Sequence, residues 1–270
     1  MCELLALSSQ RPTRLTFSLK KLAARGGLTS KYRDGWGVAF YDDKDVALFR
    51  EPTAAGDSAL VRFIEEQGPS TSLAISHIRR ATHGAIALSN TQPFARELAG
   101  RTHVFAHNGD LPDIERSMEI GVDRYRPVGA TDSEYAFCAL LDRMQALWHS
   151  SSGLPPIDKR LSVVSKFAAD LRKLGPANFL YADGDTLFAH GHRRIQSATG
   201  KVTSPGLWLL PCRCADTDEP VQVVGVSVAP GFQEGLLIAS VPLTDEKWQP
   251  FIEGEIVAVS AGKIIGRLMP

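Results

Sequence analysis

Alternation of hydrophobic and polar positions along the chain predicts many short β-strands. Segments with this period of two, rich in β-branched and aromatic residues, are typical of strands with a buried face. Two stretches are hairpin signals: NFLYADGDTLFAH turns at Asp183-Gly184-Asp185, and EIVAVSAGKIIGRL turns at Ala261-Gly262. The expected strands cover residues 3–7, 36–41, 46–49, 72–78, 103–107, 177–182, 186–190, 222–227, 236–241, 255–259 and 263–268.

A hydrophobic period of about 3.6 residues predicts helices over residues 12–27, 131–148 and 158–175. Thr131 precedes Glu134 by three positions, which is a capping-box pattern at a helix start. Helices in the middle of the chain and strands at both ends do not give a βαβα order, so the pattern indicates a layered α+β fold. The stretch SSGLPP at 151–156 is typical of a loop, and we expect one domain over residues 1–270.

Composition excludes several classes of partner. The chain has 270 residues with 30 Lys+Arg and 30 Asp+Glu, so no overall charge attracts nucleic acid or an anionic membrane. No apolar run reaches the roughly 18 residues of a membrane span, and the N-terminus does not resemble a signal peptide. Four cysteines do not make a disulfide framework in a chain of this length, so we expect a reducing, cytoplasmic location.

The cysteine at position 2 has two interpretations. Most cysteines are small buried hydrophobic residues, and Cys2 directly precedes a predicted strand. Removal of the initiator Met1 would instead make Cys2 the N-terminal residue, with a thiol and a free α-amine on the same residue. A nucleophile beside an amine base is one way to build an amide-cleaving site.

Two further stretches carry side chains suited to substrate binding and charge stabilisation. In HIRRATHG, an extended backbone points Arg79 and Arg80 to opposite faces, so only one of them serves a given pocket. Arginine binds a planar carboxylate through paired hydrogen bonds, although adjacent arginines are more often solvated. In FAHNGDL, the side-chain N–H of Asn108 and the backbone N–H of Gly109 together suit an oxyanion hole, whereas Asn-Gly alone usually marks a turn.

Other chemically capable residues have sufficient structural explanations. Asp132 lies in the first turn of a predicted helix, where the helix dipole favours an acid; it could alternatively bind a substrate ammonium group. The C-R-C sequence at 212–214 lacks a second cysteine pair for a zinc site, although it could form a strained bridge. His190 and His192 lack an accompanying H-E-x-x-H motif. We therefore expect no metal site.

The order of these stretches is more specific than any one of them. Cys at the second codon is followed by R-G, H-x-R-x-A-T-H-G, H-N-G and T-D-S-E. This series resembles the glutaminase domain of the class II glutamine amidotransferases, which are N-terminal-nucleophile hydrolases. MCELLALSSQRPT, DGWGVAFY, NTQPF and RPVGATDSEYAFC are similar to the stand-alone bacterial YafJ type. The resemblance is dense from residue 1 to about 147 and looser beyond.

The resemblance implies a four-layer αββα sandwich, with two antiparallel sheets between helical layers. It also implies hydrolysis of the glutamine side-chain amide through a cysteine thioester, releasing ammonia and glutamate without a cofactor. Cys2 would be the nucleophile and its α-amine the base, while Asn108 and Gly109 would form the oxyanion hole. The implied substrate-binding residues are Arg79 for the α-carboxylate, with Thr82 and His83 beside it, Asp132 for the α-ammonium group, and Arg25 and Gly26 in the wall near Cys2.

The sequence leaves the physiological substrate open. Many relatives carry an aromatic residue where Arg80 stands, so the pocket wall and the acceptor specificity differ from that pattern. We expect no synthase domain in the chain; ammonia would pass to a separate synthase or acceptor partner, or be released. A hydrolase of another γ-glutamyl small molecule would use the same site. A non-catalytic binding protein is the remaining alternative, which the joint presence of Cys2, Asn108 and Gly109 disfavours.

Overall fold

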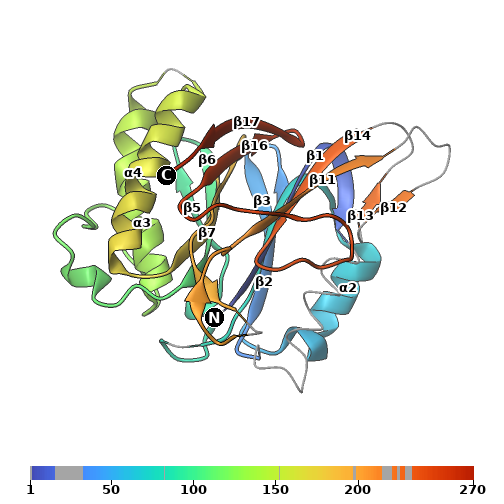
Figure 1. Ribbon diagram of the computed structural model, residues 1–270, viewed down its shortest axis with the longest axis horizontal. Coiled ribbons are helices and arrows are strands. Elements are labelled where there is room, and N and C mark those ends of the chain that lie inside the picture. Colours follow the sequence, from blue (N-terminus) through green and yellow to red (C-terminus); the bar gives the residue numbers. More distant parts are fainter. Residues whose placement is uncertain are drawn as a thin grey trace.

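Two antiparallel sheets face each other at the centre of the structure, and helices cover their outer faces (Figure 1). This computed structural model describes residues 2–15, 33–81, 83–151, 153–196, 199–214, 221–223, 226–228 and 233–270. The first sheet has the strand order β15-β11-β14-β1-β4-β2-β3, with β13 pairing to the far end of β1 and β12 pairing to β13. The second sheet has the order β17-β16-β8-β7-β6-β5.

The strand bounds show how far each segment runs. The first sheet contains β1 (Glu3–Leu15), β2 (Trp36–Asp42), β3 (Asp45–Glu51), β4 (Ser70–Ile78), β11 (Trp208–Cys214), β12 (Val221–Val223), β13 (Val226–Val228), β14 (Gln233–Ala239) and β15 (Gln249–Pro250). The second contains β5 (Phe94–Leu98), β6 (Arg101–Gly109), β7 (Ala177–Ala182), β8 (Leu187–His190), β16 (Ile256–Ser260) and β17 (Lys263–Leu268). A small separate sheet pairs β9 (Arg194–Ile195) with β10 (Val202–Thr203).

Three hydrophobic clusters fill the interfaces between the layers. Alternate residues of facing strands, such as Leu4 of β1 and Val104 of β6, meet between the two sheets. Helix α2 (Ala59–Gln67) packs Val61 against the outer face of the first sheet. Helices α3 (Asp132–His149) and α4 (Ile157–Leu174) pack Phe137 and Phe167 against the outer face of the second. The expected four-layer α+β sandwich is therefore confirmed.

Most predicted elements are present, and two predictions were wrong. Residues 12–15 continue β1 instead of starting a helix, and residues 16–27 of that predicted helix lie outside the described residues. The single strand expected over 222–227 is instead part of two short strands, β12 and β13, which pair antiparallel with Val221 opposite Val228. The start of α3 is capped as predicted, because the Glu134 N–H donates to Thr131 Oγ1 at 3.2 Å.

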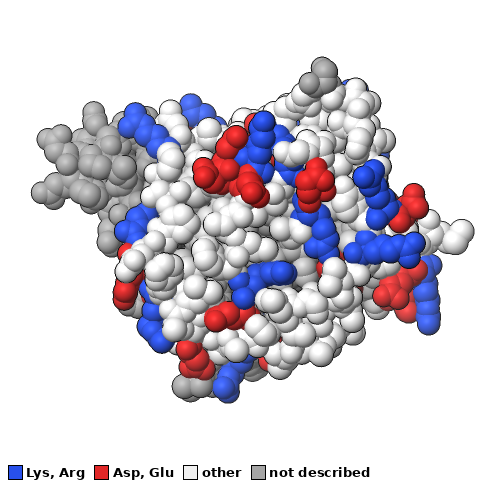
Figure 2. Space-filling view, turned by 180° about the vertical axis from the view of Figure 1, so that it is seen from behind, with Lys and Arg blue, Asp and Glu red and all other residues white. Residues whose placement is uncertain are grey.

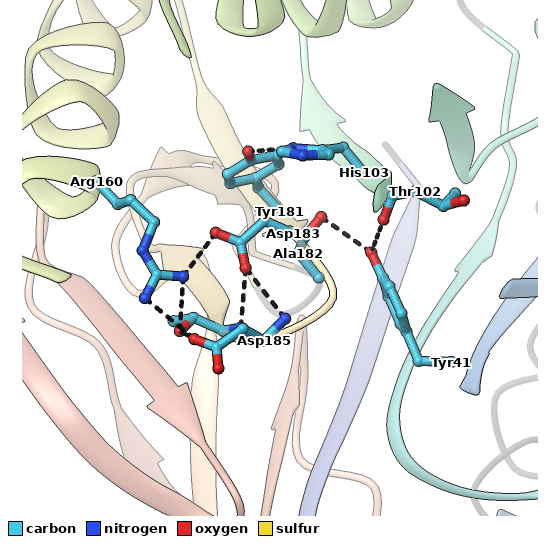
Figure 3. Close-up of polar contacts among 9 residues, drawn as sticks. Tyr41, Thr102, His103, Arg160, Tyr181, Ala182, Asp183 and Asp185 are labelled. Carbon is cyan, nitrogen blue, oxygen red and sulfur yellow. Dashed lines mark hydrogen bonds and ion pairs between the residues drawn. The ribbon is translucent and has the colours of Figure 1, made fainter. Parts of the chain in front are cut away.

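A buried arginine fixes the β7–β8 turn, at the end of the sheets away from Cys2. The carboxylate of fully buried Asp183 accepts a hydrogen bond from Arg160 Nη1 at 2.9 Å (Figure 3). The same carboxylate accepts the backbone N–H of Thr186 at 3.0 Å, and Arg160 Nη2 donates to Asp185 at 3.0 Å. Burial raises the pKa of Asp183, and the neighbouring guanidinium opposes that shift. The predicted Asp-Gly-Asp turn is thus held by α4 as well as by its own backbone.

Tyr41 fixes the two sheets to each other at this same end. Its side chain comes from β2 of the first sheet, and its hydroxyl donates to main-chain carbonyls of the second sheet (Figure 3). The hydroxyl lies 2.9 Å from the Thr102 oxygen and 3.0 Å from the Ala182 oxygen. Because β6 runs from this end to the Cys2 end, a fixed contact here limits how far the sheets can slide at the other.

Charged side chains of both signs are interspersed on the face seen from behind (Figure 2). This distribution agrees with equal numbers of acidic and basic residues in the chain. None of the helices that the structure describes is long and apolar enough to span a membrane.

Candidate active site

Cys2 lies directly before β1, a central strand of the first sheet, where β4 and β14 flank it. The Cys2 backbone nitrogen donates to Asn108 Oδ1 at 3.1 Å, which links the start of the first sheet to the end of β6 in the second. The Cys2 thiol is half-buried, and its sulfur accepts the Arg80 N–H at 3.3 Å. Burial raises the pKa of the Cys2 thiol, while the Arg80 N–H and the charge of Arg79 oppose that shift. The thiol therefore needs a base to become a thiolate near neutral pH.

Asn108 is fully buried, and both polar atoms of its side-chain amide have a hydrogen-bond partner. Its Oδ1 faces the Cys2 nitrogen, and its Nδ2 donates to Ser240 Oγ at 3.3 Å. An amide nitrogen carries two hydrogens, so one N–H of Asn108 remains for an oxygen that enters the site. The Asn108 carbonyl accepts Asn178 Nδ2 at 2.9 Å, which holds the backbone of β6 against β7.

Gly109 offers a backbone N–H beside this amide. Successive N–H groups of a strand point to opposite sides. The Asp110 N–H donates to the Pro176 carbonyl on the β7 side, and the His107 N–H donates to Gln92 Oε1 on the other side. The Gly109 N–H therefore lies on the side away from β7. A Cβ at position 109 would lie 1.8 Å from the Pro176 oxygen, so only glycine fits without a shift of the backbone.

Arg79 is buried and Arg80 is half-buried. The Arg79 guanidinium donates to the backbone carbonyls of His83, Gly84, Ala85 and Asp34 at 3.0 to 3.4 Å. In this structure it therefore holds the loop after β4. Its assignment to the substrate carboxylate stays a prediction, since that role requires at least part of the guanidinium to exchange these carbonyls for the substrate.

A cavity of about 240 Å³ lies next to this loop, with His83, Asp132 and residues 111–116 in its walls. His83 Nε2 lies 3.1 Å from Asp110 Oδ1, with both side chains more than half exposed. Asp132 accepts the Leu111 N–H at 2.9 Å, so its carboxylate fixes the chain just beyond the Asn108-Gly109 pair. The structure brings His83 and Asp132 together at this cavity. Cys2 and Asn108 meet each other and are not part of its lining.

The remaining predicted site residues, Thr82, Arg25 and Gly26, lie outside the described residues.

Sequence reasoning missed two residues that the structure places in the site. Asp34 accepts the Ala81 N–H at 2.8 Å, which connects the start of the DGWG segment to the Arg79 loop. The DGWGVAFY segment contributed to the family resemblance, but Asp34 itself was assigned no role. Ser240 accepts the N–H of Leu4 at 2.9 Å as well as that of Asn108, and no motif marks it in the sequence.

Histidines near Cys2 are poorly suited to act as its base. His77 lies on the same face of β4 as Arg79, two residues away, and burial lowers its pKa to about 3. Burial also lowers the pKa of His107. A ring with so low a pKa takes up protons weakly at neutral pH. The α-amine has a reference pKa of about 7.7–8.0, which suits a general base.

The described part of the chain contains no group of three or more His, Cys, Asp and Glu side chains arranged to hold a metal. His190 and His192 bond separately, to the Ala177 carbonyl at 2.6 Å and the Ala177 N–H at 3.3 Å.

Comparison with known proteins identifies the class to which this fold and site belong. The family model described as "Glutamine amidotransferases class-II" matches residues 1–269. The chain belongs to this family. It is 34% identical over 256 residues to YafJ of Escherichia coli K12, whose name assigns it to the glutamine amidotransferases, covering 94% of this chain and 96% of YafJ.

Solved structures agree with this assignment. A predicted glutamine amidotransferase from Pseudomonas aeruginosa PA01 superposes with a TM-score of 0.67 at 32% identity, covering 98% of this chain and all of the other. A glutamine phosphoribosylpyrophosphate amidotransferase from Bacillus subtilis shares the fold, with a TM-score of 0.58 at 13% identity. This chain spans about half of that enzyme, 49% of its length.

Proposed function

We propose that the protein hydrolyses the side-chain amide of glutamine, with Cys2 as its N-terminal nucleophile. The observation that carries the proposal is the 3.1 Å hydrogen bond from the Cys2 nitrogen to Asn108 Oδ1. It holds the prospective α-amine and thiol beside an amide that has a spare N–H donor. Family membership supports glutamine as the substrate class.

The proposed reaction balances with these groups alone. The α-amine of mature Cys2, acting through a water, takes the thiol proton, and the sulfur attacks the glutamine side-chain carbonyl carbon. The spare N–H of Asn108 and the Gly109 N–H stabilise the negative oxygen that forms. The amine returns its proton to the leaving nitrogen, so ammonia departs and a thioester remains. Water then attacks the thioester, releasing glutamate and restoring the thiol.

Arg80 favours a second candidate substrate, a γ-glutamyl conjugate with a larger or charged group on the amide nitrogen. The Arg80 backbone N–H bonds to the Cys2 sulfur at 3.3 Å, so this residue lies beside the proposed nucleophile. Its side chain carries five N–H donors and a stacking face. The same chemistry would then release an amine in place of ammonia. With glutamine as the substrate, the ammonia would be released or pass to a separate acceptor protein.

Mass spectrometry of the intact protein tests the first requirement, which is removal of Met1. Cys2→Ala should abolish turnover without unfolding the protein. Insertion of one alanine between Met1 and Cys2 should do nearly the same, because the thiol then loses its own amine. Full activity of the insertion variant would exclude the α-amine as base. A retained Met1 with no turnover would favour a non-catalytic binding protein.

A substrate comparison separates the two candidates. Release of ammonia from glutamine and of amines from γ-glutamyl amides should be measured for the wild type and for Arg80→Trp. If the second candidate is right, a conjugate should be preferred over glutamine, and Arg80→Trp should reduce that preference. Turnover of glutamine alone at about 10⁴ M⁻¹s⁻¹ or better would identify an independent glutaminase.

A further inference from the structure

Ser240 lies immediately after β14 and bonds to two parts of the site. It is fully buried. Its Oγ accepts two hydrogen bonds, from the Leu4 N–H at 2.9 Å and from Asn108 Nδ2 at 3.3 Å. Its backbone N–H donates to the Leu4 carbonyl at 3.0 Å. A single residue therefore bonds both to the strand that carries Cys2 and to the side chain that faces Cys2.

Hydrogen bonds on both sides determine which way the Asn108 amide faces. With Nδ2 bonded to Ser240 Oγ, Oδ1 is the atom that faces the Cys2 nitrogen. A flipped amide would place its NH₂ group against the Cys2 nitrogen, which is itself the donor in this hydrogen bond. It would also turn Oδ1 toward Ser240 Oγ, which could bond to it only by donating its single hydroxyl hydrogen. In the unflipped amide the second N–H of Nδ2 is left for a substrate oxygen.

A buried ion pair holds Ser240 in turn. Arg194 Nη1 donates to the Ser240 carbonyl at 2.5 Å. The same guanidinium binds the Glu3 carboxylate through two bonds, of 3.1 and 3.2 Å. The side chains of Arg194 and Glu3 are 3% and 1% exposed. Since Glu3 follows Cys2 directly, the pair connects the nucleophile's strand to the backbone of Ser240.

We infer that Ser240 is a positioning residue for the oxyanion hole: its hydroxyl, held by Arg194 and Glu3, orients the Asn108 amide toward the substrate oxygen. This inference rests on the proposed function. Ser240 itself contacts neither the thiol nor the reacting carbonyl in this arrangement. It acts through Asn108, so its loss should slow the chemical step more than it weakens substrate binding.

Ser240→Ala tests the inference, with Ser240→Thr as the conservative variant that keeps the hydroxyl. Ser8→Ala is the matched control: Ser8 is also buried, and its Oγ also accepts a buried backbone N–H, from Gly262 at 3.0 Å. Both alanine variants lose an acceptor for one main-chain N–H, but only Ser240→Ala also removes the hydrogen-bond partner of Asn108 Nδ2. We expect Ser240→Ala to lower kcat about tenfold with KM within about twofold. Ser240→Thr should recover most of the loss, and Ser8→Ala should match the wild type.

A second readout does not depend on turnover. The side-chain NH₂ signals of Asn108 in ¹⁵N-labelled protein can be assigned by their disappearance in Asn108→Asp. One of the two protons should exchange with solvent at least tenfold more slowly in the wild type and in Ser8→Ala than in Ser240→Ala. The slow proton is the one bonded to Ser240 Oγ.

The two readouts separate failure of this inference from failure of the proposed function. Equal kcat for Ser240→Ala and Ser8→Ala would overturn the positioning role, as would identical exchange of the Asn108 protons in both. If the wild type cleaves no γ-glutamyl amide but the exchange difference is present, Ser240 orients Asn108 and the proposed reaction is wrong.

Discussion

The buried ion pair between Glu3 and Arg194 should contribute strongly to the free energy of unfolding, and Glu3 is the residue that follows Cys2. Arg194→Met removes two hydrogen bonds to a carboxylate that is only 1% exposed, together with the donor to the Ser240 carbonyl. Removing one partner of a buried pair costs about 3–5 kcal/mol, because the other charge stays in a poorly solvated place.

Urea unfolding, followed by circular dichroism, measures this cost. With a slope of about 3 kcal/mol/M, a loss of about 3–5 kcal/mol lowers the midpoint by about 1–1.7 M. Adding Glu3→Gln should recover at least about 2 kcal/mol, because the buried charge is then gone; the bond to the Ser240 carbonyl is lost in both variants and cancels. The control is Arg193→Met, whose ion pair with Glu253 is exposed and should contribute about 1 kcal/mol or less.

Two results would refute this reasoning. One is a decrease in the free energy of unfolding for Arg194→Met that is no larger than the decrease for Arg193→Met. This result would mean that the Glu3 carboxylate is well solvated without its partner. The other is a double variant less stable than Arg194→Met, which would mean that the Glu3 charge stabilises the fold through contacts other than Arg194.

Three further predictions follow from the site and the core. Asn108→Ala should lower kcat by about 10²–10³, measured by ammonia release, with a much smaller change in KM; an unchanged kcat would remove it from the oxyanion hole. Gly109→Ala should lower both the unfolding midpoint and the activity, whereas Gly121→Ala, where an added Cβ meets nothing within 4 Å, should lower neither. The free energy of unfolding should fall as pH falls from about 6.5 toward 3, because burial lowers the pKa of three histidines to about 3 in the folded protein. In this pH range the unfolded chain therefore binds protons that the folded chain does not. Each could contribute a slope of up to about 1.4 kcal/mol per pH unit, so replacing one with a neutral residue should flatten the measured curve. These histidines are His77, His103 and His190.

Local patterns predicted the elements whose environment is simple. The bounds of β7 and β17 match the prediction, because each belongs to a hairpin with a recognisable turn. Helix α2 was missed since it has nine residues, too short for a clear period of 3.6. Strand β11 was missed because Pro211 interrupts its pattern, which is unusual within a sheet. The interpretation of residues 1–270 as one domain stays a prediction.

The site was predictable only where one short motif contains the relevant atoms. Asn108 and Gly109 are adjacent, so a single turn presents both N–H donors. The four backbone carbonyls around Arg79 could not be foreseen, because they depend on how the loop at residues 83–85 returns to the end of β4. Ser240 lies 132 positions from Asn108 and 236 from Leu4, and its serine resembles any other serine in the sequence.

Once Met1 is removed, the proposed nucleophile Cys2 would have no preceding residue to fix it, so its position would come from tertiary contacts. Here those contacts come from three directions. The thiol bonds to the end of β4, the nitrogen bonds to the end of β6, and β1 is tied through Leu4 to Ser240 after β14. Two of these elements belong to the first sheet and one to the second, so the distance from Cys2 to Asn108 depends on how the sheets stack. Tyr41 fixes that stacking at the far end by bonding across to β6 and β7. The proposed reactivity of Cys2 therefore depends on the whole sandwich: a change that lets the sheets slide should separate Cys2 from Asn108 and lower activity even when every site residue is intact.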